Sequence, residues 1–335
     1  MNRWRSAAII LVLLNVFMFF LSLFLGRYAI PPSEVASALC SPFFSLGEKP
    51  THLTQIVIFH VRLPRVLIAM LVGAGLGITG ASFQGVFRNP LVSPYILGVS
   101  SGGGFGAALA ILLFDSTGMI QLLAFVFGLV AVGITFLIAR IGDKISTYSL
   151  VLSGVVVGAF FSALISLLKY VADIYTKLPA IVFWLMGSLA SVKIEDLLTT
   201  APVIIIGTAV LIMLRWRFNI LSLGSTEAQG LGINTKALYL VIITCSTLIA
   251  SSIVAIAGII GWVGLVVPHL CRMMVGADHS KLLPASALMG SAYLVMVDDV
   301  ARMITGQEIP LGIVTAIIGA PFFAYLLNRN HGGTS

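Results

Sequence analysis

Three arginines near the ends of apolar segments are the first side chains in this sequence that could do binding chemistry. Arg62 and Arg65 frame the tetrapeptide RLPR before the apolar segment 66–83, and Arg302 follows Asp299 by three residues. A guanidinium group binds a carboxylate through two parallel hydrogen bonds, so three of them on one surface would suit an acidic docking partner. The alternative is that these arginines only end helices at the lipid–water interface, with Arg302 paired internally to Asp299.

Residues for nucleotide hydrolysis, ion coupling or metal binding are not apparent. The dipeptide Gly-Lys does not occur, so the phosphate loop G-x-x-x-x-G-K-[ST] is absent. Acidic and lysine side chains do not fall in the middle of the apolar segments, where ion-coupled carriers usually hold them. His269 and His279 lie ten residues apart without a third ligand, and Cys40, Cys245 and Cys271 lack metal-like spacing. We expect no catalytic group, cofactor or metal in this chain. If the chain is part of a transporter, its energy must come from another subunit.

The composition indicates a membrane protein. The 335 residues are 59% hydrophobic and 9% charged, with a mean hydropathy of +1.09. The apolar runs are longer than barrel strands and do not alternate, so they predict an all-α polytopic membrane protein with a single domain over residues 1–335. The net charge of +7 comes from dispersed basic residues, which is typical of membrane topology and does not indicate nucleic-acid binding.

Apolar segments predict about ten transmembrane helices, with both termini in the cytoplasm. They are residues 7–25, 66–83, 96–114, 120–139, 150–168, 197–214, 237–256, a short or broken crossing after residue 259, and then 284–297 and 309–327. Residues 180–190 are too few to cross and predict a re-entrant or surface helix. The first segment could also be a secretory signal, but it is long for one and no small-x-small cleavage site follows.

Glycines in the second and third segments predict close packing between helices. Gly73, Gly75 and Gly77 alternate along the second segment, and residues 102–104 are three consecutive glycines in the third. Small residues let helix backbones approach each other closely inside a membrane. We therefore expect the second segment to lie among other helices, away from lipid.

The longest polar inner loop, residues 219–236, holds a second candidate site. Its tripeptide Ser-Thr-Glu at 225–227 resembles a helix start, with a hydroxyl cap and an acid in the first turn. Gly230 and Gly232 can end a short helix. Such a helix, held along the membrane, could transmit movement from a cytoplasmic partner, although an ordinary solvated loop would show the same spacing.

Several longer motifs cover most of the chain. They are RLPR at 62–65, GVFRNPLVSPYILGVSSG at 85–102, LGSTEAQGLGI at 223–233, GWVGLVVPHLCRMMVGADH at 261–279, and DDVAR with EIPLGIVTAIIGAPFF near the end. Together they resemble the FecCD family of ABC-transporter permeases, which serve iron–siderophore, haem and cobalamin importers. Such a series is highly specific for the family and says little about the cargo.

The resemblance implies a type II ABC importer permease architecture. It implies ten spans, a homodimer with the pathway along its twofold axis, two cytoplasmic subunits that bind ATP and Mg, and a substrate-binding protein outside. Arg62, Arg65 and Arg302 would dock the binding protein. The residues implied for ATPase coupling are Leu221, Ser225, Thr226, Glu227, Gly230 and Gly232, and those implied for a cytoplasmic gate are Asn89, Leu91, Ser146 and Thr147.

These features together predict a permease of the inner or cytoplasmic membrane that does no chemistry on its cargo. A ferric siderophore is the first expectation, followed by haem, cobalamin or an oxyanion such as molybdate. The alternative is a secondary transporter, which would need only an ion gradient. An intramembrane enzyme would require clustered catalytic groups within the spans, and none is visible in the sequence.

Overall fold

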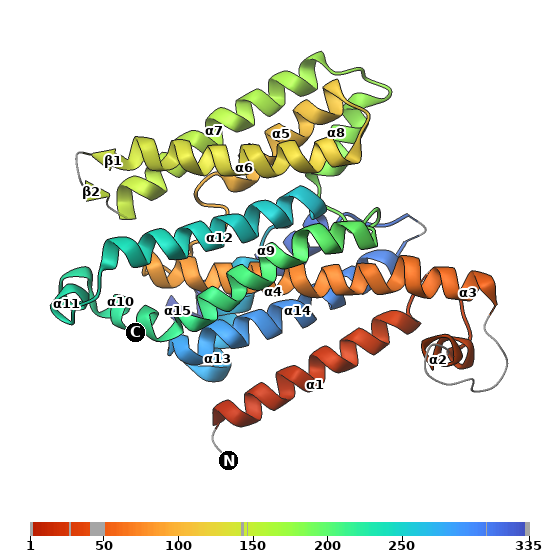
Figure 1. Cartoon of the computed structure of the whole chain (residues 1–335), viewed down its shortest axis with the longest axis horizontal. Helices are drawn as coiled ribbons and strands as arrows, with labels where there is room; N and C mark the ends of the chain where they lie inside the picture. The colour runs from red at the N-terminus through yellow and green to blue at the C-terminus, as the bar shows by residue number, and fades with distance from the viewer. Residues whose placement is uncertain are drawn as a thin grey trace.

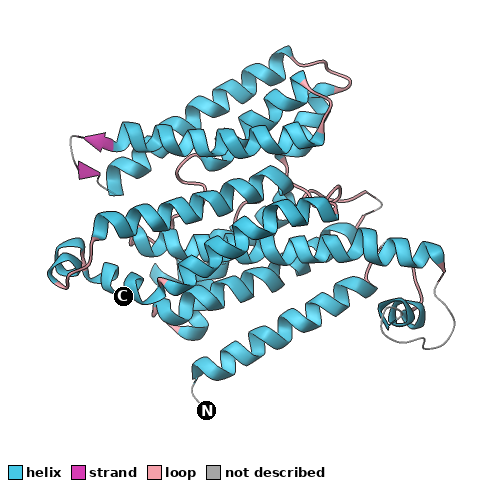
Figure 2. Ribbon diagram, viewed as in Figure 1, coloured by secondary structure: helices cyan, strands magenta, loops and turns pink. Residues whose placement is uncertain are grey.

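The computed structural model describes residues 3–26, 28–40, 51–141, 144–145, 147–305 and 307–331. This part of the chain is almost entirely helical (Figures 1 and 2). Its described strands, β1 (Arg140–Ile141) and β2 (Lys144–Ile145), form one short antiparallel pair. The predicted all-α fold is confirmed apart from this hairpin.

Seven of the described helices are long and apolar enough to cross a membrane. They are α1 (Arg3–Phe24), the continuous helix of α3 (His52–Ile56), a π-helical turn (Val57–Arg62) and α4 (Leu63–Val86), then α6 (Thr117–Ala139), α7 (Thr147–Val171), α9 (Ile194–Met213), α12 (Thr235–Ala257) and α14 (His279–Met303). Three shorter apolar helices, α5 (Val99–Leu113), α13 (Val263–Val275) and α15 (Leu311–His331), lie where the third, eighth and tenth crossings are predicted. The multi-span fold is confirmed, and a count of ten crossings stays a prediction.

Four short helices complete the described architecture. They are α2 (Pro32–Cys40), α8 (Lys177–Leu185), α10 (Arg215–Leu223) and α11 (Ser225–Gly230). The predicted surface or re-entrant segment 180–190 corresponds to α8. In Figure 1, α2 and α3 lie at one end of the molecule, whereas α10, α11 and the β1–β2 hairpin lie at the other. These two ends are called outer and inner below according to the predicted topology.

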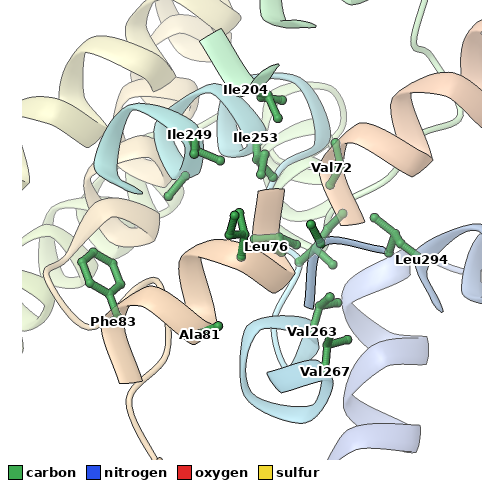
Figure 3. Packing of buried hydrophobic residues seen from close by; sticks show 14 of the residues in the cluster. Val72, Leu76, Ala81, Phe83, Ile204, Ile249, Ile253, Val263, Val267 and Leu294 are labelled. Carbon is green, nitrogen blue, oxygen red and sulfur yellow. The ribbon is translucent and has the colours of Figure 1, made fainter. Parts of the chain in front are cut away.

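Helix α4 occupies the centre of the fold. Layers formed by α5, α6 and α7 lie on one side of it beyond α12, and α13, α14 and α1 lie on the other side (Figure 1). Figure 3 shows Leu76 of α4 between Ile249 and Ile253 of α12 and the α13 residues Val263 and Val267. Because α4 is surrounded by protein along most of its length, its side chains connect most of the other crossings.

The backbones of α4 and α14 lie so close together that the contact positions leave no room for a side chain. A Cβ atom on Gly73 would overlap the carbonyl oxygen of Gly290, and one on Gly77 would overlap that of Ser286. Gly102 in α5 lies in the same way against the carbonyl of Phe127 in α6. These contacts confirm close packing between helices, with backbone against backbone at Gly73, Gly77 and Gly102, whereas Gly75 lies against side chains of α12.

Two of the shorter apolar helices follow irregular segments, and these segments meet inside the fold. Helices α5 and α13 contain 15 and 13 residues, or about 22 and 20 Å, which is short of the ~30 Å hydrocarbon core. The Tyr95 hydroxyl, before α5, donates to the Ile260 carbonyl before α13, at 3.1 Å. Pro94 lies against Gly264 beside this hydrogen bond. Irregular backbone is thus covered by protein, as a membrane requires.

Candidate functional site

Arg65, in the first turn of α4, is held by two carboxylates of its own chain. Its Nε and Nη2 atoms donate to the Asp298 carboxylate of α14, at 2.9 and 2.8 Å. Its Nη1 atom donates to Glu308 at 2.9 Å. The Asp298 side chain is 1% exposed and that of Glu308 is 21% exposed. The first ion pair is therefore sealed inside the protein, and the second reaches the surface.

Arg62 is bound to the end of α1. Its Nη1 atom donates to the carbonyl oxygens of Leu23 and Phe24, at 2.7 and 3.1 Å, and its Nη2 atom donates to that of Tyr28 at 2.5 Å. The last carbonyl groups of a helix have no partner within it and carry partial negative charge. Arg62 therefore caps α1 and ties it to the outer end of α4.

Arg302 links α14 to α1. Its guanidinium group is ion-paired with Asp299 and donates to the carbonyl oxygen of Ser22 at 3.0 Å. The Ser22 hydroxyl in turn donates to Asp299 at 2.6 Å. The internal pairing of Arg302 with Asp299, considered from their spacing, is confirmed. Helix α14 continues past residue 297, where the predicted apolar segment ends, to Met303, so these charged side chains lie in its last turns and are buried.

The structure brings the three predicted docking arginines to one end of the fold and covers them there. Arg62, Arg65 and Arg302 are 3%, 6% and 4% exposed. We call the set Arg62, Arg65, Asp298, Asp299, Arg302 and Glu308 the outer charge cluster. Its three cations and three carboxylates sum to zero formal charge. The expected open cationic surface is therefore absent from the described outer end in this conformation, and a docking role for the arginines stays a prediction.

The inner loop folds as two helices. Gly224 separates α10 from α11 and has a φ of 138°, a conformation that side chains disfavour. The cap position falls on Gly224, one residue before the tripeptide in which a hydroxyl cap is predicted. Glu227 does lie in the first turn of α11. The predicted end is confirmed, because α11 stops at Gly230.

The residues of this loop differ in their access to a partner. Thr226, Glu227 and Gly230 of α11 and the following Gly232 are exposed. Leu221 of α10 is 1% exposed, so its side chain packs inside the protein. The surface that α11 offers at the inner end is therefore small and polar, whereas α10 anchors it.

An amide clamp attaches α10 to α14, and the sequence analysis did not identify it. Asn219 Nδ2 donates to Asp278 Oδ1 at 2.7 Å, and Asn219 Oδ1 accepts the backbone N–H of His279 at 2.8 Å. The ring of Phe218 stacks on that of His279, with centroids 5.7 Å apart. His279 is a buried residue in the first turn of α14. The partners are about 60 residues apart, so no spacing signals the contact.

Asp278 serves the clamp and the helix cap together. Its Oδ1 atom accepts the Ser280 backbone N–H at 2.9 Å and the Ser280 hydroxyl at 2.7 Å. Burial opposes ionisation, but hydrogen bonds from Ser280, Asn219 and Lys281 prevail and hold the pKa of Asp278 well below its usual range. A carboxylate that remains charged accepts stronger hydrogen bonds than a neutral group would.

The predicted gate residues lie at the inner end. Asn89 and Leu91 are exposed in the loop after α4, where Asn89 Oδ1 accepts the Leu91 backbone N–H at 2.9 Å. Thr147 begins α7 and is exposed, and Ser146 lies outside the described residues. Further along α7, Gly154 packs against the backbone of Ile96. A gating role for these residues remains a prediction.

A cavity of about 760 Å³ lies away from all these residues. It opens between α5, α6, α8 and the end of α12, and Phe114, Phe183 and Trp184 are among its lining residues. Lys177 and Asp115 form an ion pair of 2.5 Å beside it. Within the described residues, no group of three His, Cys, Asp or Glu side chains could hold a metal ion.

Comparisons with known proteins agree on one family. The family model described as the FecCD transport family matches residues 13–329. The molybdate import permease MolB of Haemophilus influenzae is 44% identical, over 95% of this chain and 94% of its own. A probable iron chelatin transport permease of Helicobacter pylori is 44% identical, over 83% and 84%. A metal-chelate type ABC transporter solved in an inward-facing conformation matches with a TM-score of 0.87 and 42% identity, over 97% and 99% of the two chains.

Proposed function

The chain belongs to the FecCD transport family and is a permease subunit of an ABC importer for metal chelates; from this premise we propose that its cargo is a ferric siderophore. The observation that carries the proposal is the match over nearly the whole length to a metal-chelate type transporter. The similarity to an iron chelatin permease supports iron. Chelates of this kind are large and varied, so we assign their selection to a separate binding protein.

Molybdate is the second candidate cargo. It is supported by the MolB relative, whose similarity extends over 95% of this chain. The two cargoes are separated by uptake into liposomes that contain the assembled transporter, with radioactive iron in a hydroxamate or catecholate chelate in one arm and radioactive molybdate in the other. Accumulation of molybdate alone would replace the ferric proposal.

We propose that the working assembly is a homodimer with ten spans per subunit and both termini in the cytoplasm. Two ATPase subunits would bind at the inner end, and a substrate-binding protein would bind at the outer end. The family membership supports these partners. The chain has no phosphate loop, so ATP and Mg would be bound by the partner subunits.

In the proposed mechanism, closure of the ATPase pair around ATP moves α11. The exposed residues Thr226 and Glu227 would face the ATPase, and Gly224 would let α11 turn relative to α10. The movement would then open or close the inner end, where Asn89, Leu91 and Thr147 would form the gate. Alternation between outward and inward openings would carry the chelate without any chemical step on it.

Docking at the outer end would require exchange of partners within the outer charge cluster. Arg65 is already paired with Asp298 and Glu308, so an acidic binding protein must replace one of them. Glu308 is the more exposed of the two and is held through one guanidinium nitrogen, at 2.9 Å. We propose that a carboxylate of the binding protein takes its place.

The energy source distinguishes this proposal from an ion-driven carrier. The assembled transporter in liposomes should import chelate only with internal ATP and the binding protein, and collapse of proton and sodium gradients should leave uptake unchanged. Gradient-driven uptake by this chain alone would overturn the proposal.

A further inference from the structure

The short helix α10 packs against the start of α14 and, through Phe218, against Gly85 at the inner end of α4. It follows α9 directly and precedes α11, from which Gly224 separates it. Its buried side chains are Phe218 and Leu221, and its polar link to a distant crossing is Asn219. A displacement of α11 therefore reaches α14 through the residues around Asn219.

We propose that Asn219 is a positioning residue that couples α11 to α14, so that a push on α11 tilts or shifts α14. The inference rests on the proposed function, because it assumes an ATPase that acts on α11. The geometry favours Asn219 because its amide grips the first turn of α14 at two points. Nδ2 binds the capping carboxylate of Asp278, and Oδ1 binds the backbone N–H of His279.

The same helix carries the signal on to the outer end. Helix α14 contains 25 residues, or about 37 Å at 1.5 Å per residue. Its last two turns contain Asp298, Asp299 and Arg302 of the outer charge cluster. Between its ends, Gly290 and Ser286 lie against the α4 backbone, so α14 and α4 move as one packed pair. A shift at Asp278 therefore reaches the predicted docking end without a flexible segment in between.

A second contact, between α11 and α12, supplies a control residue for the test. Gln229 of α11 donates to the Thr235 hydroxyl at the start of α12, at 3.0 Å, and the nearby Asn234 caps α12 through the Ala237 N–H at 3.0 Å. Asn234 is thus an asparagine of the same loop that caps a neighbouring helix and has no part in the clamp. Asn234→Asp keeps an acceptor for this cap and adds the same charge to the loop.

The test is Asn219→Asp in the permease assembled with its partner ATPase and binding protein in liposomes. The aspartate can still accept the His279 N–H, but it cannot donate to Asp278 and places two carboxylates together. Chelate imported per ATP hydrolysed should fall about tenfold, because a lost hydrogen bond to a charged group is worth a factor of this order. ATP hydrolysis itself should continue, and Asn234→Asp should keep the wild-type ratio.

The double variant Asn219→Asp with Asp278→Asn exchanges donor and acceptor across the same contact. The new asparagine can donate to the new aspartate, but its Nδ2 atom then stands where Asp278 Oδ1 accepts the Ser280 N–H, so the transport ratio should recover only in part. If Asn219→Asp does not assemble, Asn219→Ser carries the test, since it is too short to reach Asp278 and adds no charge. A purely structural role would lower assembly and leave the ratio unchanged.

Two failures can be told apart. A wild-type assembly without ATP-dependent uptake would refute the proposed function. A working wild type with an unchanged ratio in Asn219→Asp or Asn219→Ser, or with no recovery in the double variant, would refute the coupling role of Asn219 alone.

Discussion

Different interactions hold the two ends of the α4–α14 pair in place. At the outer end, Arg65 and Asp298 connect the helices directly through a buried ion pair. At the inner end, each helix is instead tied to a different neighbour by a hydrogen bond between an amide side chain and a charged one. Gln84 of α4 accepts from Arg272 of α13 at 2.6 Å, and Asn219 joins α10 to the start of α14.

The difference teaches how one helix pair can be fixed at one end and adjustable at the other. Breaking a buried ion pair on one side costs about 3–5 kcal/mol, because an unpaired charge remains inside the protein. A hydrogen bond with one charged partner contributes a net ~1.5–3 kcal/mol, less than the buried ion pair, so it is more easily exchanged. We call the Arg65–Asp298 ion pair the clasp, and the hydrogen bonds Gln84–Arg272 and Asn219–Asp278 the joint. The following variants test whether the clasp is the stronger connection.

The largest effect is expected from opening the clasp. Arg65→Met leaves Asp298 buried without its cation and should lower the free energy of unfolding by about 3–5 kcal/mol. Thermal unfolding in detergent measures the change. Lys177→Met is the control, because its partner Asp115 is 92% exposed and such pairs contribute about 0–1 kcal/mol. Equal losses in the two variants would contradict a clasp.

The next effect tests whether the two ends communicate through the glycine contact. Gly290→Ala places a Cβ against the carbonyl of Gly73, so it should destabilise the protein by about 1–3 kcal/mol through overpacking. Gly133→Ala in α6 meets no atom within 4 Å and should be neutral or stabilising by up to ~1 kcal/mol. The same unfolding assay compares them, and equal tolerance would mean that α4 and α14 separate freely.

A smaller effect sharpens the role of Glu308 at the outer end. Glu308→Gln removes the half-buried competitor for Arg65, so binding of an acidic binding protein should tighten up to about fivefold, equivalent to ~1 kcal/mol for an ion pair that reaches the surface. Glu34→Gln makes the same charge change on α2, where Glu34 accepts from Thr54 at 2.8 Å. Titration of the binding protein onto the permease should separate the two variants. If the two variants bind the binding protein with equal affinity, any gain over wild type comes from the change in net charge alone.

The smallest effect concerns the pH response of the joint. The folded pKa of Asp278 is lowered, so its stabilisation is complete above the unfolded value near 4 and is lost as the pH falls through the folded value. Asp278→Asn should therefore cost at most ~1 kcal/mol at pH 7, and the difference from wild type should shrink in strong acid. Unfolding curves at pH 7 and in strong acid check this. A difference in stability between wild type and variant that grows in acid would contradict a lowered pKa for Asp278.

The amino-acid sequence by itself determined the membrane class, the helical crossings and the family. Hydropathy and helix-breaking residues act over short stretches of chain, so 66–83 and 237–256 predicted α4 and α12 closely. The alternating glycines predicted close packing because a missing Cβ matters in any tight contact. Only the tertiary structure decided which carboxylates neutralise Arg65, and that Asn219 grips His279. Those partners lie 233, 243 and 60 residues away, and burial and pairing over such separations depend on which helix surfaces meet.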